Sequence, residues 1–410
     1  MKRLMTLCSA IIIAMSAFAQ LEGCKEILSI KITGAEGSSS VTCNDSLAAS
    51  FVAFSGYCDN EYFKGKILPG AFDNQKKIDG RTRLSARYML EGKDKANQKC
   101  KIFIENNAIE GSSYSQPRVF TDSKALAFLN TSELIGYLDH ANNQFYVRIY
   151  VKEPHATTEN ITIQGSRGKL AATLETPALK AGEKCPIVII CHGFGGNRNG
   201  GLTSDVAVQL PKDGIATLRF DFNGHGESEG KMVDMTVPNE IEDAMLAYQY
   251  AASLPFVDTN KIGMLGHSQG GVVTSMVAGE LGYKKLAAVV LMSPASVLRD
   301  DCIRGNVMGS FFNPLDPPEK VAIGNISIGK EYIRTAFTLP IYETAERYHG
   351  KACIIHGTGD RVVPYTYGIR YHEIWPGSEY HELPGFDHGF YPDPQKAVKI
   401  AVDFLEKALK

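Results

Sequence analysis

Residues 266–270, Gly-His-Ser-Gln-Gly, place a serine between small residues where two kinds of segment meet. They follow the apolar run 261–265, which is typical of a buried strand, and they precede a helix-like run from residue 271. A strand that passes directly into a helix must turn sharply, and glycines allow the backbone to crowd there. Ser268 would project from that turn, open to a substrate and to a base, although such turns also occur for packing reasons alone.

A serine hydroxyl is a weak nucleophile at neutral pH, so Ser268 needs a base and an orienting acid. In the fold that carries such a turn, the chain order is serine, then acid, then histidine. Asp360 follows the apolar run 352–356, and His388 follows the strand-like run 380–383. Each residue alone is equally an ordinary loop residue. Found in this order, each after a strand, they are the predicted catalytic partners of Ser268.

A glycine-rich loop at 192–196 follows the apolar strand 186–191. In this fold, such a loop donates one backbone N–H to the oxyanion that forms during acyl transfer, here that of Phe194. The N–H of Gln269, next after the serine, is the predicted second donor. A similar loop can cradle a phosphate, but no lysine follows it at the spacing of a phosphate-binding loop.

The other charged and metal-binding residue types suggest no further chemistry. His225, His267 and His356 are expected to have structural roles. No Cys/His cluster has metal-binding spacing, so we expect no metal and no organic cofactor. The net charge of −2, the pI near 6.6 and the lack of a polybasic run exclude nucleic acid and anionic membranes as expected partners.

Residues 1–19 read as a secretory signal peptide. They combine a basic start, a mostly apolar stretch and the small-x-small sequence at 17–19, which predicts cleavage before Gln20. A lipoprotein with Cys24 as the lipidation site is the alternative, although Glu22 fits the lipidation box poorly. No second long apolar run follows, so we expect a soluble secreted or periplasmic protein without a membrane span.

The length of 410 residues predicts two or three domains, and the pattern of apolar residues changes once along the chain. Residues 20–151 contain short alternating segments separated by turn residues, which predicts an all-β barrel or sandwich. Within this region only 123–138 has a helical pattern. The runs 67–70, 84–92 and 104–107 resemble a family of uncharacterised bacterial β-barrel domains.

Residues 152–158 are polar, contain a proline and are predicted to be a linker. Beyond them, continuously apolar strands alternate with amphipathic helices, which predicts a mostly parallel sheet with helices on both faces. The predicted strands include 186–191, 216–220, 286–291 and 352–356, and the predicted helices include 237–252, 271–282 and 395–409. In such sheets the chemistry lies at the carboxyl ends of the strands.

Cysteine usage suits an exported protein only in part. Cys24, Cys43, Cys58 and Cys100 could form two disulfides, with three pairings that the sequence does not separate. Cys191 and Cys353 lie in apolar runs and are expected to be buried thiols.

Together these motifs resemble the α/β-hydrolase fold over residues 159–410, and more closely the bacterial cinnamoyl (feruloyl) esterases. The resemblance is carried by the motifs at 192–194, 219–226, 241–244, 266–271, 339–343 and 387–388. It implies a lid at about 293–339 that covers the acyl pocket. In the family, an aspartate and a tyrosine of this lid bind the hydroxyl of the cinnamoyl ring.

By motif match, the two lid residues correspond to Asp301 and Tyr332, although Asp300 could replace Asp301. Met308 stands where the family often has a glutamine, so the recognition of the ring departs from the family pattern. A solvated lid charge is the competing interpretation of Asp301.

The leading hypothesis is therefore a secreted serine esterase that hydrolyses hydroxycinnamoyl (feruloyl or coumaroyl) esters of plant cell-wall polysaccharides. Its substrate would be a small ester or a feruloylated oligosaccharide; the oligomeric state stays open. One alternative is a general carboxylesterase or acetylesterase. Another is a protein whose N-terminal domain is mainly a carbohydrate-binding module, using the aromatics Tyr57, Tyr62, Phe63 and Tyr114. A peptidase of this fold is disfavoured, because the N-terminal region is too short for a propeller.

Overall fold

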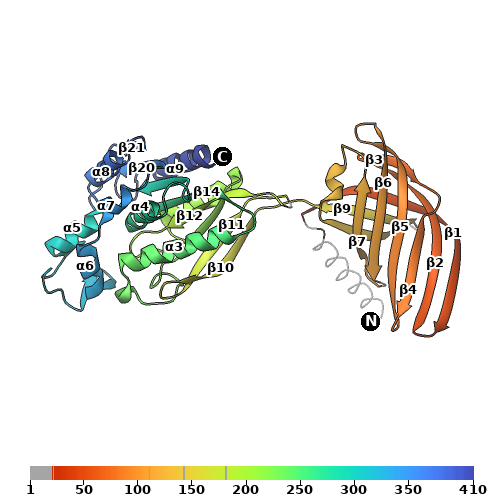
Figure 1. Cartoon of the computed structure of the whole chain (residues 1–410), viewed down its shortest axis with the longest axis horizontal. Helices are drawn as coiled ribbons and strands as arrows, with labels where there is room; N and C mark the ends of the chain where they lie inside the picture. Colours follow the sequence, from red (N-terminus) through yellow and green to blue (C-terminus); the bar gives the residue numbers. More distant parts are fainter. Residues whose placement is uncertain (1–20, 22, 110, 142–143, 181) are drawn as a thin grey trace, which may run out of the picture. The chain divides into compact units, whose positions relative to one another are not determined.

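The computed structural model describes residues 21, 23–109, 111–141, 144–180 and 182–410 (Figure 1). The predicted signal peptide lies outside the described residues. The chain divides into two compact units between Pro154 and His155, inside the range predicted as a linker. Among the described residues, no helix is both long enough and apolar enough to cross a membrane.

The first unit is a closed barrel of antiparallel strands. The strands are β1 (Cys24–Asn44), β2 (Leu47–Asp59), β3 (Phe63–Ile67), β4 (Phe72–Ile78), β5 (Arg81–Asp94), β6 (Lys99–Ile109), β7 (Tyr114–Thr121), β8 (Leu134–Ala141) and β9 (Gln144–Lys152). β1 pairs with β9 on one side and β2 on the other, so the sheet closes on itself. β3 and β4 share one position between β2 and β5, which gives eight positions. The predicted all-β barrel is confirmed.

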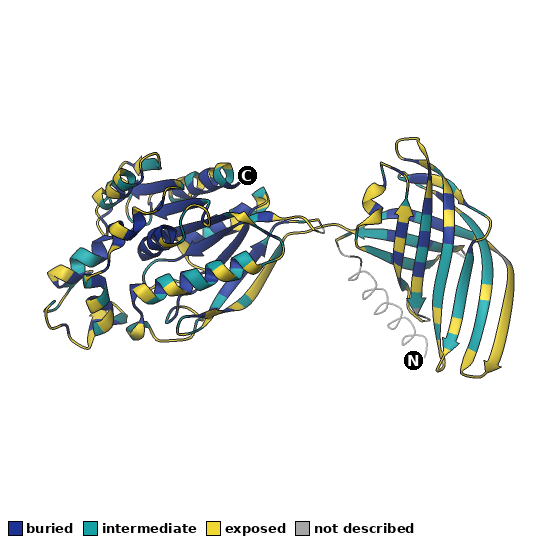
Figure 2. Cartoon of the chain, viewed as in Figure 1, coloured by how far each residue is buried: buried dark blue, intermediate teal, exposed yellow. Residues whose placement is uncertain are grey.

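Period-two alternation along the strands directs one set of side chains into the barrel. Leu28 and Ile30 of β1 and Ile104 of β6 are fully buried there. Leu126, just before the short helix η1 (Ala127–Asn130), joins the same core. Figure 2 shows that the barrel strands are nevertheless mostly of intermediate burial.

The helix predicted over 123–138 is wrong. The segment forms only η1, and residues from Leu134 onward are strand β8, which pairs with β9 over its whole length. Ser123 caps the turn, because its hydroxyl donates to the Asp94 carboxylate and accepts from the Leu126 N–H. The ladder to β9 therefore outweighs the local helical pattern.

The two disulfides considered for the first unit do not form, because Cys43, Cys58 and Cys100 are free thiols. Cys58 and Cys100 lie in one lateral row of the barrel, separated by Gly65 and Gly92 on the two strands between them. Three strand spacings place their Cα atoms roughly 14 Å apart. A disulfide needs less than about 7 Å.

The second unit is built on a mixed sheet. Its strands, in spatial order, are β10 (Thr157–Gly165), β11 (Gly168–Thr176), β13 (Ala216–Phe220), β12 (Cys185–Cys191), β14 (Val257–His267), β15 (Ala288–Met292), β20 (Lys351–Gly357) and β21 (Glu379–Leu383). The strands from β13 to β21 are parallel, whereas β10 and β11 form an antiparallel edge. β10 starts within the range predicted as a linker.

Helices cover both faces of this sheet, as the sequence predicts (Figure 1). The helices and helical turns are α2 (Gly201–Gln209), η2 (Leu210–Asp213), η3 (Met232–Asp234), α3 (Val237–Ser253), α4 (Gln269–Leu281), α8 (Thr366–Ile374) and α9 (Pro394–Leu409). α3, α4 and α8 pack with Ile187 and Ile189 of β12. α2 and α9 pack with Val188 and Ile190 of the same strand. Because adjacent residues face opposite sides, the continuously apolar strand fills two cores.

The segment predicted as a lid lies outside the main sheet. It contains α5 (Val297–Arg304), the hairpins β16 (Asn306–Val307) with β17 (Ser310–Phe311) and β18 (Lys320–Ile323) with β19 (Ile326–Gly329), and α6 (Lys330–Phe337). α7 (Ile341–Ala345) follows it. α5 and α6 contact each other, so the segment is an ordered subdomain.

Because each unit has its own core, we expect Ile104→Ala to destabilise the barrel alone, by about 3 kcal/mol from lost burial and a residual cavity. Trp375, the only tryptophan, is 3% exposed in the second unit and therefore reports that unit selectively. Urea unfolding should show an earlier circular-dichroism transition for the barrel and an unchanged Trp375 fluorescence transition. Ile354→Ala, in the second core, should move the fluorescence transition instead. Joint movement of both transitions would refute independent folding.

Candidate active site

Ser268 forms the turn between β14 and α4, at the carboxyl end of a central strand. Its backbone has φ 56° and ψ −123°, a region that non-glycine residues rarely occupy. The Ser268 N–H donates to the Met292 carbonyl, and its own carbonyl accepts from Gly271 and Ala295. These bonds hold a strained conformation that points the side chain out of the sheet.

The glycines around Ser268 are required by close backbone contacts. A Cβ atom on Gly266 would lie 2.0 Å from the Gly270 carbonyl oxygen, and one on Gly270 would lie 2.4 Å from the Cys191 carbonyl oxygen. No side chain fits at either position. The motif seen in the sequence is therefore a steric requirement of the turn.

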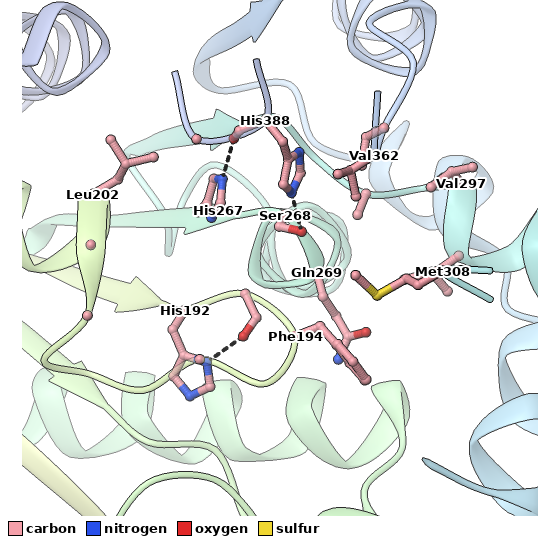
Figure 3. Close-up of a pocket in the computed structure, with 18 of the residues that line it drawn as sticks. His192, Phe194, Leu202, His267, Ser268, Gln269, Val297, Met308, Val362 and His388 are labelled. Carbon is pink, nitrogen blue, oxygen red and sulfur yellow. Dashed lines mark hydrogen bonds between the residues drawn. The ribbon is translucent and has the colours of Figure 1, made fainter. Parts of the chain in front are cut away.

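The structure brings Ser268, His388 and Asp360 together from three strand ends. His388 Nε2 lies 3.0 Å from Ser268 Oγ (Figure 3). His388 Nδ1 lies 2.7 Å from Asp360 Oδ2. Ser268 is 9% exposed and Asp360 is 8% exposed. The geometry is that of a serine nucleophile with a histidine base oriented by a buried carboxylate.

Asp360 is held as a carboxylate by its neighbours. Burial disfavours its charge, but hydrogen bonds from His356 and His388 and the electrostatic interaction with His388 hold its pKa well below its ordinary value. The N–H groups of Val362 and Val363 donate to Asp360 Oδ1, each at 2.8 Å. The side chain is therefore ionised while it orients His388.

His356, to which the sequence assigns a structural role, contacts the triad directly. Its Nε2 lies 3.2 Å from Asp360 Oδ2 and 3.1 Å from the Val363 carbonyl, which can only accept. Nε2 therefore carries the proton and donates to Asp360. Its place at the end of a strand, four residues before Asp360, is the only signal for this contact in the sequence.

Three further histidines support the backbone of the site. His267 Nε2 lies 3.0 Å from the His388 carbonyl, and His192 Nδ1 lies 2.8 Å from the Gly193 carbonyl. Burial lowers the pKa of each to about 4, so both are neutral at neutral pH. His225 Nε2 accepts from the Gly195 N–H at 3.3 Å. These three side chains position the loops around the reacting groups.

Phe194 and Gln269 flank the serine on the side opposite His388 (Figure 3). Gln269 is the first residue of α4, where backbone N–H groups have no partner within the helix. In the described part of the chain, the amide N–H groups of Phe194 and Gln269 have no hydrogen-bond partner. Both are thus available to an oxyanion.

The Gln269 side chain connects the turn to the lid, a link that the motifs did not predict. Its Nε2 donates to Glu240 Oε2 at 2.8 Å, and its Oε1 accepts from the Tyr332 hydroxyl at 2.8 Å. Glu240 and Tyr332 are each 2% exposed. Burial raises the pKa of Glu240 to about 8, so this carboxyl is mostly protonated at neutral pH. We call this group the Glu240–Gln269–Tyr332 network.

A cavity of about 920 Å³ opens over Ser268 and is closed on one side by the lid. Asp301, Tyr332 and Met308 line it. Asp301 also pairs with Arg304 at 2.6 Å, and burial raises its pKa. Asp300, the alternative ring-binding residue, instead accepts from the Tyr367 hydroxyl and does not line the cavity. Among the described residues, no group of three or more His, Cys, Asp or Glu is placed to hold a metal.

Comparison with known families and curated proteins covers part of the chain. The model of the family described as "Serine aminopeptidase, S33" matches residues 182–317, about a third of the chain. An uncharacterised 31.7 kDa protein of Escherichia coli is 30% identical over 163 residues, which are 40% of this chain and 55% of the relative. The quorum-quenching protein AidA of Acinetobacter baumannii is 34% identical over 110 residues, 27% of this chain and 35% of the relative. The chain spans about half the length of the curated relatives it matches.

Among solved structures, Est1E of Butyrivibrio proteoclasticus with ferulic acid bound is similar, with a TM-score of 0.57 and 28% identity. That similarity covers 60% of this chain and 98% of Est1E. The α/β hydrolase GrgF of a Penicillium species has a TM-score of 0.51 at 19% identity over 62% of this chain and 99% of GrgF, which supports the fold alone. The unit that begins at His155 is therefore an α/β-hydrolase domain.

Proposed function

We propose that this protein is a serine esterase that removes hydroxycinnamoyl groups, such as feruloyl or coumaroyl, from plant cell-wall polysaccharides. The observation that carries the proposal is the Ser268–His388–Asp360 geometry at the wall of a lidded cavity. The similarity to Est1E, which was solved with ferulic acid bound, supports the acyl group.

In the acylation step, Ser268 Oγ attacks the ester carbonyl carbon while its proton passes to His388 Nε2. The negative oxygen of the tetrahedral intermediate is bound by the N–H groups of Phe194 and Gln269. The ester C–O bond then breaks, and the sugar hydroxyl leaves with the proton from His388. Asp360 stabilises the imidazolium during this step because it is ionised.

In the deacylation step, water replaces the sugar alcohol. His388 removes a proton from the water, and the hydroxide attacks the carbonyl of the acyl-serine. Collapse of the second intermediate releases the hydroxycinnamic acid and returns the proton to Ser268. The same two N–H donors serve both intermediates, and no step needs a metal or an organic cofactor.

The lid is proposed to recognise the ring of the acyl group. Asp301 faces the cavity and offers a carboxylate oxygen to a phenolic hydroxyl. Tyr332 is proposed to contact the ring beside Asp301 through its side chain, because its own hydroxyl proton is already donated to Gln269. Met308 contributes apolar surface to this part of the cavity.

A general carboxylesterase is the nearest alternative. A peptidase is a second alternative, because the matching family model is described as a serine aminopeptidase. The ratio of kcat/KM for methyl ferulate, p-nitrophenyl acetate and an aminoacyl p-nitroanilide separates the three activities. Of the aromatics behind the carbohydrate-binding alternative, Phe63 is core and Tyr62 lies under Lys25 and Lys95, whereas Tyr57 is 40% exposed.

Export from the cytoplasm is part of the proposal and depends on the signal sequence at residues 1–19. A polysaccharide substrate cannot enter the cell intact, so the enzyme must meet it outside or in the periplasm. A free exported protein is proposed rather than one anchored by lipid at Cys24. Mass spectrometry of the mature N-terminus separates these two forms.

Ser268→Ala should lower kcat for methyl ferulate by at least about 10⁴-fold, because no other group replaces the nucleophile. The matched control is Ser253→Ala, an exposed serine at the end of α3, which should keep wild-type activity. Released ferulate is measured by absorbance, and Trp375 fluorescence verifies folding. Retention of activity in Ser268→Ala would exclude the proposed mechanism.

Asp301→Asn should raise KM for methyl ferulate roughly tenfold, because a hydrogen bond to a charged acceptor is weakened. Methyl cinnamate, which has no ring hydroxyl, should be hydrolysed as by wild type. Asp300→Asn is the matched control and should change neither substrate. An equal loss on both esters would remove Asp301 from ring recognition.

Glu240→Gln should alter the pH dependence of stability while preserving the hydrogen bond to Gln269. Between its ordinary pKa of 4.5 and about 8, Glu240 is protonated in the folded state and ionised in the unfolded state. The wild-type free energy of unfolding should therefore fall as pH rises through this window, relative to the variant, on the order of a few kcal/mol.

Urea unfolding followed by Trp375 fluorescence at pH 5, 6.5 and 8 measures this difference. Glu242→Gln, an exposed neighbour on α3, is the control and should parallel wild type. Parallel curves for wild type and Glu240→Gln would show that Glu240 is not protonated in the folded protein.

A further inference from the structure

The barrel of the first unit contains a cavity of about 730 Å³, separate from the active site. Its wall includes Ile32, Phe54, Ala86 and Phe145, which face the interior yet are only partly buried. The barrel interior is therefore filled at one level and hollow at another. Eight strands enclose enough space to hold one small molecule.

The filled level lies toward the end where the chain leaves the barrel. Leu28 and Ile30 are fully buried, and they follow closely after Cys24, which pairs with Lys152. The hollow level begins at residues 31–34, further along β1. The cavity therefore belongs to the half of the barrel that lies away from the linker, and it is formed by the first unit alone.

Two buried side-chain oxygens of the cavity wall have no hydrogen-bond partner among the residues that the structure describes. The Tyr88 hydroxyl and Asn106 Oδ1 are unpartnered, with side chains 3% and 6% exposed. Because Ala86 pairs with Asn106 and Tyr88 pairs with Ile104, the two residues are diagonal neighbours on the inner face. Both polar groups thus belong to one patch of the cavity wall.

A third buried oxygen without a partner among the described residues is Ser115 Oγ. A Cβ atom on Gly136 would lie 1.9 Å from Ser115 Oγ and 3.3 Å from Asn106 Oδ1, so both oxygens lie next to Gly136. Each buried polar group without a partner costs about 1–3 kcal/mol. Such a group in an apolar cavity indicates that a ligand or water completes its hydrogen bonds.

We propose that the barrel is a binding site for a small, uncharged, ring-containing molecule that carries a hydroxyl or N–H donor. The donor would bind Asn106 Oδ1 beside the Tyr88 hydroxyl, and the ring would contact Phe54 and Phe145. This site is independent of the esterase activity proposed for the second unit.

The volume of the cavity and the charges of its wall favour a small, uncharged ligand. Ligand sites of small molecules commonly enclose about 300–1,000 Å³, and this cavity lies in that range. Lys31 and Asp73 are the only charged residues of its wall among the described residues, and they carry opposite charges. Asp73 is already bonded to the Ser85 N–H and to Gln75. A neutral molecule is therefore favoured over an anion or a cation.

The test uses the full chain and the neutral fluorescent probe N-phenyl-1-naphthylamine. We expect saturable binding with a rise in fluorescence, and displacement by 2-naphthol roughly fivefold more effective than by 2-methoxynaphthalene, which has no donor. Tyr88→Phe and Asn106→Leu should each lower the affinity ratio of 2-naphthol to 2-methoxynaphthalene toward one. Neither substitution removes the apolar wall of the cavity.

Ala86→Trp fills the cavity and should lower probe affinity at least tenfold. The matched control is Met89→Trp on the same strand, which faces outward, is 37% exposed and should bind as wild type. Circular dichroism verifies the fold of each variant. If Ala86→Trp does not fold, the affinity ratio of 2-naphthol to 2-methoxynaphthalene in Tyr88→Phe tests the proposal instead.

Probe binding that persists in folded Ala86→Trp would place the probe outside the barrel and overturn the proposal. No binding by wild type would show that the cavity holds water alone. An unchanged preference for 2-naphthol in both Tyr88→Phe and Asn106→Leu would also overturn it.

Discussion

The reactive part of this molecule depends on one backbone constraint, the reversal of the chain at Ser268. A strand must end and a helix must begin without an intervening loop, so Ser268 adopts φ 56° and its neighbours must lack side chains. The parallel sheet absorbs this strain, because β12 and β15 pair with β14 on both sides up to the turn. The same sheet places the loops that carry Asp360 and His388 at its carboxyl edge.

The site contains two buried carboxyl groups in different protonation states, an ionised Asp360 and a mostly protonated Glu240. Asp360 accepts four hydrogen bonds and is ionised. Among the described residues, Glu240 accepts one hydrogen bond, from Gln269, and burial keeps it mostly protonated at neutral pH. The number of donors around each group decides which state costs less. Through Gln269, the neutral carboxyl links α3, the turn at Ser268 and the lid residue Tyr332.

The interiors of the two units are packed in different ways. In the second unit, each continuously apolar strand packs against helices on both faces, so its buried side chains fill two cores. In the barrel, one face of each strand must fill the whole interior, and small or polar residues such as Ala86 and Asn106 leave it partly hollow. The hollow level is where the unpartnered oxygens lie.

The sequence by itself determined the fold class and the strand-turn-helix at Ser268, and it pointed to Asp360 and His388, which the structure brings together with Ser268. These follow from local patterns and chain order, since each residue ends a recognisable strand. Tertiary structure decided what depends on contacts between distant segments. It brought His356 to Asp360, joined Tyr332 to Gln269, and turned 134–141 into a strand by pairing it with β9. It also kept Cys58 and Cys100 apart, because strand order in the barrel, not spacing along the chain, sets their separation.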